Sequence, residues 1–180
     1  MIEGPSGVGK STLLHIVAGL LQPYQGDVIV DGVALKTEDI HAFQKSIGLV
    51  PQSPVLIQDT LAKNIAFAED DEIDFERLKK VCDHAALTSF IENLPLKFQT
   101  PIGENGTNVS GGQRQRITLA RALYRDADLL LLDEVTNQLD ETTKEKVLNN
   151  LKALCSHGKT IILSSHDSFV KQYVNKIIRL

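Results

Sequence analysis

The sequence predicts an α/β fold in which a mostly parallel β-sheet is flanked by helices. Two short apolar runs, residues 129–132 and 161–163, contain no polar residue, which is typical of strands buried on both faces. Residues 110–125 and 141–154 have the apolar spacing of helices with one buried face. Because strands and helices alternate along the chain, they favour a parallel sheet with helices on both sides.

The N-terminal part of the chain extends this pattern. A glycine-rich turn over residues 4–9 leads into a helix over residues 11–20, whose buried face we expect to include Leu20 and Leu21. Further short strands are predicted at residues 28–30, 47–50 and 177–178, with a turn at Asp31 and Gly32. We expect the strand at 177–178 to be buried like the two apolar runs.

Residues 60–94 interrupt the alternation, because they have helical spacing throughout. One apolar stripe is formed by Phe75, Leu78, Cys82 and Ala85. We therefore expect an inserted helical subdomain here, with Cys82 in its core.

The composition excludes several classes of protein. The 180 residues are enough for one domain, and the formal net charge of -4 without a basic block argues against a nucleic-acid partner. Cys82 and Cys155 lie far apart with no second Cys or His at metal-ligand spacing, as expected for reduced thiols in a cytosolic compartment. No apolar run approaches the roughly 20 residues that span a bilayer, and the first residues have no signal-peptide pattern. A membrane function therefore needs a transmembrane part outside this sequence.

The glycine-rich turn matches the phosphate-binding loop of P-loop NTPases at every fixed position. The nucleotide-binding residues are Gly4, Pro5, Ser6, Gly7, Val8, Gly9, Lys10, Ser11 and Thr12. The loop is expected to wrap so tightly around a phosphate that only glycines avoid a clash, with its N–H groups and a helix N-terminus facing the anion. Lys10 is placed to reach the β- and γ-phosphates of ATP, and the Ser11 hydroxyl is placed to bind Mg²⁺.

Two carboxylates, Asp133 and Glu134, follow the apolar run at 129–132. In an open parallel sheet, ligands bind at the carboxyl ends of the strands. Asp133 suits the second shell of Mg²⁺, which it would contact through water, and Glu134 is placed to polarise an attacking water. The sequence therefore predicts ATP hydrolysis in addition to ATP binding.

A second anion site is predicted at Ser110, Gly111, Gly112 and Gln113. Ser110 is a good helix N-cap, and the two glycines leave the N–H groups of the first turn open to an anion. One nucleotide rarely needs two such sites in one molecule. The second site is therefore expected to bind the ATP of a partner.

These motifs together resemble the nucleotide-binding domain of ABC (ATP-binding cassette) transporters over essentially the whole chain. Six motifs agree in order and spacing. They are the Walker A loop with Lys10, the Q-loop with Gln52, the signature from Ser110 to Gln113, Walker B with Asp133 and Glu134, the D-loop from Asn137 to Asp140, and the switch histidine, His166.

The resemblance implies a mechanism and a division of the chain. Two such domains, identical or different, pair head to tail and trap ATP between one Walker A loop and the partner's signature. Glu134 orients the water, His166 holds the γ-phosphate and Gln52 completes the Mg²⁺ shell with Ser11. Residues 1–55 and 115–180 correspond to a RecA-like core and 56–114 to the helical signature subdomain. A transmembrane partner would hold the domain at the cytoplasmic face of a membrane, where hydrolysis powers transport of a solute.

Two further segments favour an exporter-type cassette over an importer subunit. Residues 100–106 are similar to the T-x-V-G-E-x-G stretch before the signature of exporters, and residues 59–65 to their G-T-I-x-x-N-I run.

The chain also departs from the family pattern. Val109 replaces the usual leucine of the signature, and residues 137–140 read N-Q-L-D where S-A-L-D is commoner. Only Met1 to Glu3 precede the phosphate loop. We therefore expect a truncated N-terminus, in which the antiparallel strands, the adenine-stacking aromatic residue and most of the strand supporting the loop are absent.

Three alternatives compete with a transport ATPase. The truncated N-terminus favours a non-hydrolysing partner that binds or regulates another cassette. A GTPase needs an N/T-K-x-D motif, which residues 137–140 imitate without the lysine. DNA-repair and chromosome-organising ATPases share the signature, but the stretch between Gln52 and Ser110 is too short for their coiled coil.

Several cationic residues are expected to have no catalytic role. The histidines with surface or capping roles are His15, His41, His84 and His157. Arginines at helical spacing after the signature are interpreted as a solvated or partner-facing stripe; they are Arg114, Arg116, Arg121 and Arg125.

Overall fold

A five-stranded parallel sheet is the centre of the molecule. The structure, a computed structural model, describes residues 1–180 except for the side chain of Asn105. The strand order is β4 (Ile47–Val50), β5 (Leu129–Asp133), β6 (Thr160–Ser164), β1 (Ile2–Glu3) and β7 (Ile178–Arg179), and every recorded pair is parallel. Strands β2 (Ile29–Val30) and β3 (Val33–Ala34) form a separate antiparallel hairpin around the predicted turn.

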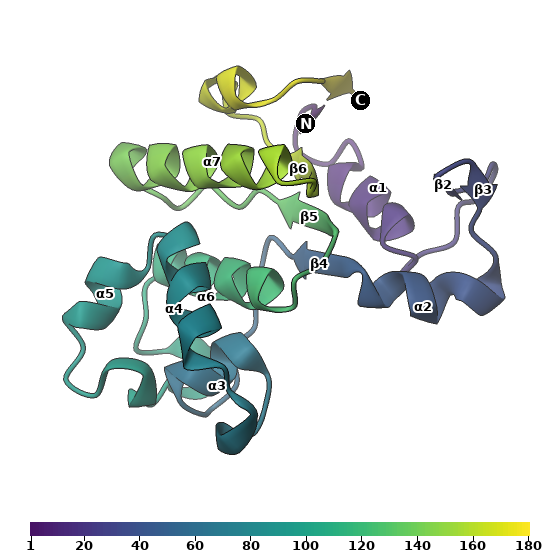
Figure 1. The fold of residues 1–180 in the computed structure, drawn as a ribbon. Coiled ribbons are helices and arrows are strands. Elements are labelled where there is room, and N and C mark those ends of the chain that lie inside the picture. Colours follow the sequence, from purple (N-terminus) through teal and green to yellow (C-terminus); the bar gives the residue numbers. More distant parts are fainter.

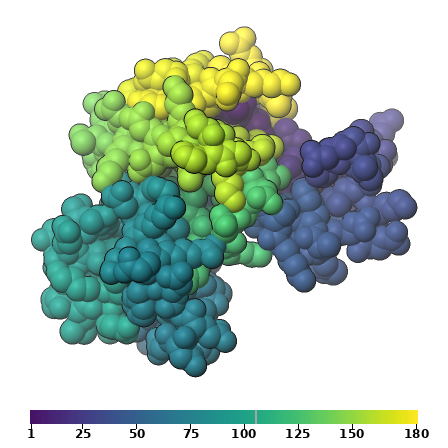
Figure 2. All heavy atoms as spheres, viewed as in Figure 1, coloured from purple at the N-terminus to yellow at the C-terminus, as the bar shows by residue number. Residues whose placement is uncertain are grey.

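The described residues form seven α-helices, of which α3, α4 and α5 lie to one side of the sheet (Figure 1). They are α1 (Lys10–Val17), α2 (Ile40–Lys45), α3 (Leu61–Ala66), α4 (Phe75–His84), α5 (Thr88–Glu92), α6 (Gly111–Tyr124) and α7 (Glu141–Ser156). Short 3-10 helices lie at Thr37–Asp39, Asp70–Glu72, Lys97–Gln99, Glu104–Gly106 and Ser168–Tyr173. In Figure 2 the teal residues of α3 to α5 gather at the lower left, and the blue residues of α2 lie at the right.

The alternation of side chains along β5 separates two apolar cores. Leu130 and Leu132 belong to the larger core, which also contains the buried residues of α3, α4, α6 and α7. Leu131 packs in a smaller core with Leu14 and Ala18 from the region of α1. Because successive strand residues point to opposite faces, one apolar run supplies both layers. The predicted fold class, a parallel sheet with helices on both faces, is confirmed.

Helices α3, α4 and α5 gather beside α6, in the segment predicted to be a helical insertion (Figure 1). Cys82 is buried in their core as predicted, and this burial raises the pKa of its thiol to about 12. Phe75, predicted to share that apolar stripe, is instead exposed at the first turn of α4, with its ring edge-on to Phe98.

Two expectations about the ends of elements are wrong. Helix α1 stops at Val17 because Gly19 adopts a φ of 66°, and Leu20 and Leu21 are consequently exposed. The predicted strand at 177–178 forms as β7, but Ile178 is exposed, because β7 is an edge strand that pairs only with β1.

The strand that precedes the phosphate loop is present in a short form. Ile2 and Glu3 form β1, which pairs with β6 on one side and β7 on the other. Ile2 is buried in the smaller core. These two residues anchor the loop in the sheet.

Candidate functional site

Four neighbouring strands bring the predicted motifs to one edge of the sheet. The carboxyl end of β1 leads into the loop before α1, and that of β4 leads to Gln52. Strand β5 ends at Asp133, and β6 is followed by His166. Because the strands are parallel, all four segments emerge on the same side.

The phosphate-binding loop depends on the backbone freedom of two glycines. Gly7 has a φ of 83° and Gly9, the N-cap of α1, a φ of 108°. Apart from the adjacent residues, no described atom lies within 4 Å of a Cβ built at either position. The positive φ angles of Gly7 and Gly9 therefore require glycine within this chain itself. The reason expected from the sequence was steric room around a bound phosphate.

Lys10 is buried, and its ammonium group closes the loop. Its Nζ donates to the carbonyl oxygens of Gly4 at 2.9 Å and Pro5 at 3.0 Å. Ser11 and Thr12 follow at the start of α1, and neither side chain makes a hydrogen bond among the described residues. Lys10 is therefore held at the centre of the loop, with the Ser11 hydroxyl uncommitted beside it.

The carboxylate of Glu134 joins the separate motifs. Its Oε2 accepts hydrogen bonds from Gln52 Nε2, at 3.1 Å, and from Asn137 Nδ2, at 2.5 Å. Its Oε1 lies 3.8 Å from Lys10 Nζ and 3.5 Å from His166 Nδ1. Glu134 is buried and has a φ of 51°, which is rare for a residue other than glycine. Strained backbone of this kind persists where the surroundings fix it, often at functional sites.

Three further side chains hold this arrangement through contacts that were not predicted. Ser164 Oγ donates to Asp133 Oδ1 and accepts from the N–H of Glu134. Gln115, buried on α6, donates through Nε2 to the carbonyl oxygen of Glu134 at 2.8 Å. Asn137 is the third. The only sequence signal for Ser164 is its position at the end of β6, and Gln115 has no signal apart from its place after the signature.

The signature residues form a helix N-terminus, as predicted. Ser110 caps α6 by accepting from the N–H of Gln113, whose Oε1 accepts from the N–H of Ser110. No hydrogen bond or ion pair of the described residues joins these residues to the loop before α1. The two segments are therefore separate sites within this chain.

The glycines of the signature pack closely against Gln138. A Cβ built on Gly111 would meet Gln138 Oε1, and one built on Gly112 lies 2.5 Å from the Gln138 carbonyl oxygen. Asp140, at the end of the same segment, is the N-cap of α7 and accepts from the N–H of Thr143 at 2.9 Å. This hydrogen bond is the main reason that the pKa of Asp140 is lowered.

The interpretation of the arginines after the signature as a solvated or partner-facing stripe is wrong for Arg116 and Arg121. Arg121 donates to the carbonyl oxygens of Asn64, at 2.7 Å, and Val55, at 3.0 Å, and burial lowers its pKa to about 10. Arg116 donates to the carbonyl oxygen of Ala86. Both side chains reach across to neighbouring elements because their planar donor groups match backbone carbonyls there.

Among the other candidates, His157 has the predicted capping role, with Nδ1 2.8 Å from the carbonyl oxygen of Ala153. In the part of the chain that the structure describes, no three His, Cys, Asp or Glu side chains are grouped to hold a metal ion. Over the same residues, no helix has the length and apolar character needed to cross a bilayer.

Comparison with known proteins gives one consistent family. The family model described as ABC transporter matches residues 1–137. The chain is 38% identical to an ATP-dependent lipid A-core flippase of Ralstonia nicotianae, over 99% of this chain and 30% of that protein. It is also 38% identical to the mitochondrial iron-sulfur clusters transporter ATM1 of Candida glabrata, over 99% of this chain and 25% of that protein.

A solved structure shows the same fold. The structure of a bacterial Atm1-family ABC exporter with ATP bound superposes with a TM-score of 0.89 and 33% identity. The match covers 99% of this chain and 31% of the exporter chain. This chain thus spans about a third, or less, of the length of these relatives.

Proposed function

The chain belongs to the ABC transporter family, and we propose that it binds ATP with Mg²⁺ and hydrolyses it as one half of a pair. The observation that carries this proposal is the Glu134 carboxylate, which contacts Gln52, Asn137, Lys10 and His166 from four different segments. A carboxylate held in this way next to a phosphate-binding loop suits a hydrolase better than a protein that only binds nucleotide.

The residues present fit a magnesium-nucleotide complex. Residues 4–12 supply N–H groups, a helix N-terminus and the Lys10 ammonium group for the phosphates. The hydroxyl of Ser11, the amide oxygen of Gln52 and, through water, the carboxylate of Asp133 are oxygen ligands of the type that Mg²⁺ prefers. When bound, the metal neutralises charge on the phosphate oxygens.

Hydrolysis rests on the position of Glu134. Gln52 and Asn137 donate hydrogen bonds to its Oε2, and these bonds keep its Oε1 oriented toward Lys10 and His166. From there Glu134 orients and polarises the attacking water. His166 is 58% exposed at its side chain, which leaves it accessible to the γ-phosphate.

The remaining motifs are assigned to a partner. Ser110, Gly111, Gly112 and Gln113 would bind the ATP held by a second ABC domain, with Asp140 at the interface between the two. We infer that the pair is joined to a transmembrane domain at the cytoplasmic face of a membrane, because the relatives of which this chain covers about 30% are named as flippases and transporters. Exporter-type transport is supported by the Atm1-family structure.

The substitution Glu134→Gln tests hydrolysis directly. Steady-state ATP hydrolysis should fall by about 10² to 10⁴-fold, the typical contribution of a positioned general base. Binding of Mg·ATP, measured by calorimetry, should persist. The matched control is Glu141→Gln, which changes an exposed carboxylate in the first turn of α7 and should leave the rate unchanged.

The competing function is a non-hydrolysing partner that binds or regulates another cassette. If hydrolysis by the chain, alone or with its membrane partner, is unaffected by Glu134→Gln, the proposal is wrong and this alternative replaces it.

A further inference from the structure

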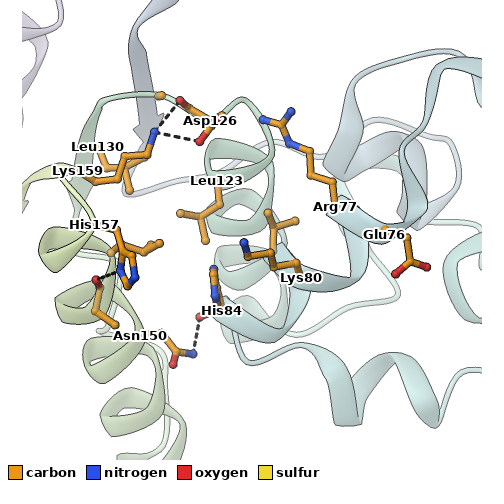
Figure 3. A pocket seen from close by; sticks show the side chains of 14 residues that line it. Glu76, Arg77, Lys80, His84, Leu123, Asp126, Leu130, Asn150, His157 and Lys159 are labelled. Atoms are coloured by element: carbon orange, nitrogen blue, oxygen red, sulfur yellow. Dashed lines mark hydrogen bonds and ion pairs between the residues drawn. The ribbon is translucent and has the colours of Figure 1, made fainter.

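A large cavity lies between α4, the end of α6 and α7, away from the Glu134 site. Its volume is about 870 Å³. Asp126 and Ala127, which precede β5, and Lys159, which precedes β6, form one wall. The cavity therefore opens at the amino ends of these strands, whereas Glu134 follows the carboxyl end of β5. Figure 3 shows its labelled side chains.

The floor of the cavity is apolar. Val81, Leu130 and Ala127 are buried there, and Leu123 and Leu154 complete it. An apolar floor of this extent suits the body of a small organic molecule better than a bare inorganic ion.

The wall formed by α4 carries two cationic side chains, Arg77 and Lys80, that form no ion pair among the described residues. Arg77, Lys80 and His84 follow one another at helical spacing, so they share one face of α4. Lys80 and His84 point toward Leu123 and His157 in Figure 3. Among the described residues, no carboxylate lies within ion-pair distance of Arg77 or Lys80.

The acidic residues nearby are already paired. Asp126 lies 2.9 Å from Lys159 Nζ, and hydrogen bonding within this pair lowers the pKa of Asp126. Glu76 pairs with Lys79 at 2.8 Å and points away from the cavity (Figure 3). Arg77 and Lys80 therefore form a cationic site without an ion-pair partner among the described residues, although Asp126 is near enough for their charges to contribute to the lowering of its pKa.

We propose that this cavity binds a phosphomonoester with an aromatic or other apolar body, up to the size of a nucleotide. Arg77 and Lys80 bind the phosphate, with charge-assisted hydrogen bonds of the kind that arginine and lysine make to phosphate oxygens. The apolar body rests on Leu123 and Leu130. Asn150, on α7, uses its amide group to donate to the carbonyl oxygens of Asp83 and His84, which leaves its Oδ1 as an acceptor for a ligand hydroxyl.

A ligand in this position contacts α4 and α7 together. These helices belong to segments far apart in the sequence, and Asn150 and Lys146 of α7 both form hydrogen bonds to the end of α4. Occupancy therefore stabilises the packing of the helical insertion against the sheet, at a site separate from the proposed nucleotide site.

The test uses 1-naphthyl phosphate as the probe and the amide NMR spectrum of the uniformly ¹⁵N-labelled chain as the readout. Saturable shifts are expected at the amides of His84, Ala127 and His157. In Lys80→Glu the apparent Kd should rise at least about tenfold, as expected when an ionic hydrogen bond is lost. Arg77→Gln should also raise the apparent Kd for 1-naphthyl phosphate.

Two matched controls separate this site from other phosphate sites. Lys79→Glu reverses the charge of the neighbouring lysine, which pairs with Glu76, and should leave the Kd unchanged. Lys10→Ala removes the ammonium group of the phosphate-binding loop and should also leave it unchanged. The amide spectrum of each variant reports in the same experiment whether it is folded.

Several results of these binding experiments would overturn the proposal. They are no saturable shift at the cavity amides up to the solubility limit of the probe, shifts confined to residues 4–12, and equal weakening by Lys79→Glu and Lys80→Glu. Binding of 1-naphthol as tight as that of 1-naphthyl phosphate would also contradict it, since the phosphate would then contribute nothing.

Discussion

At the scale of single residues, the environment of Glu134 explains why an uncommon residue stands at position 137. Asn137 Nδ2 and Gln52 Nε2 both donate to Glu134 Oε2, so two amides restrain one carboxylate oxygen. The commoner serine at this position also carries a donor. Asn137 is therefore a positioning residue in the proposed mechanism, acting through Glu134.

Asn137→Ala should lower kcat for ATP hydrolysis about tenfold, since misplacing a reacting group costs on this scale, while the KM for ATP stays unchanged. Asn137→Ser should restore most of the rate because it returns a donor. Asn149→Ala, at an exposed asparagine on α7, is the control. A KM that rises while kcat stays constant would show that Asn137 acts in nucleotide binding instead.

Gly111 and Gly112 should differ in their tolerance of a side chain. Gly112→Ala should lower the free energy of unfolding by about 1–3 kcal/mol, because its Cβ meets the Gln138 carbonyl oxygen, which is backbone. Gly111→Ala should cost less, since the mobile end of the Gln138 side chain moves away. Urea denaturation of both variants measures the two free energies of unfolding. A larger loss for Gly111→Ala than for Gly112→Ala would contradict the prediction.

At the scale of elements, α6 connects the signature to the larger core. It begins at the Ser110 cap, carries Gln115 to the Glu134 backbone and ends against the sheet. Arg121 ties it to α3 and to the segment before α3. The guanidinium group of Arg121 also lies over the Phe67 ring, 4.5 Å from its centroid.

Arg121→Met should lower the free energy of unfolding by about 2 kcal/mol, because it leaves carbonyl oxygens without their charged donor. Arg125→Met, at an exposed position one turn later, should change stability by less than about 0.5 kcal/mol. If the two substitutions change the free energy of unfolding equally in thermal or urea unfolding, Arg121 belongs to the solvated or partner-facing stripe after all.

The segment after β6 is tied to α7 by an ion pair between Asp167 and Lys144. The hydrogen bond from Lys144, followed by one from the N–H of Phe169, lowers the pKa of Asp167. The pKa of Asp167 in the folded chain therefore lies below its unfolded value of about 3.9. The stabilisation that the Asp167–Lys144 ion pair gives the fold is fully present above this unfolded pKa. It is lost as pH falls through the folded pKa.

Asp167→Asn should therefore reduce the loss of stability of the chain between pH 5 and pH 3, measured by urea unfolding at each pH. Asp71→Asn, which removes an exposed carboxylate with no ion pair among the described residues, serves as the control. An unchanged pH slope in Asp167→Asn would mean that the ion pair adds nothing to folding.

At the scale of the whole molecule, the sequence predicted the parallel sheet and the motifs at its carboxyl edge. Short apolar strands and a loop with fixed glycines have local signals, and parallel strands bring their ends together. Contacts such as Gln115 to Glu134 or Arg121 to Asn64 depend on how helices approach each other in three dimensions, for which the sequence has no local signal. The division into a core and a helical subdomain at 56–114 stays a prediction.

The central claim, a pair of domains with ATP between them, is tested most directly by sedimentation of Glu134→Gln with and without Mg·ATP. Blocked hydrolysis should let the paired state accumulate, so the account predicts a monomer without nucleotide and a dimer with it. Adding Lys10→Ala or Ser110→Arg should abolish the dimer, since each damages one side of the shared site. A chain that stays monomeric under both conditions would contradict the account.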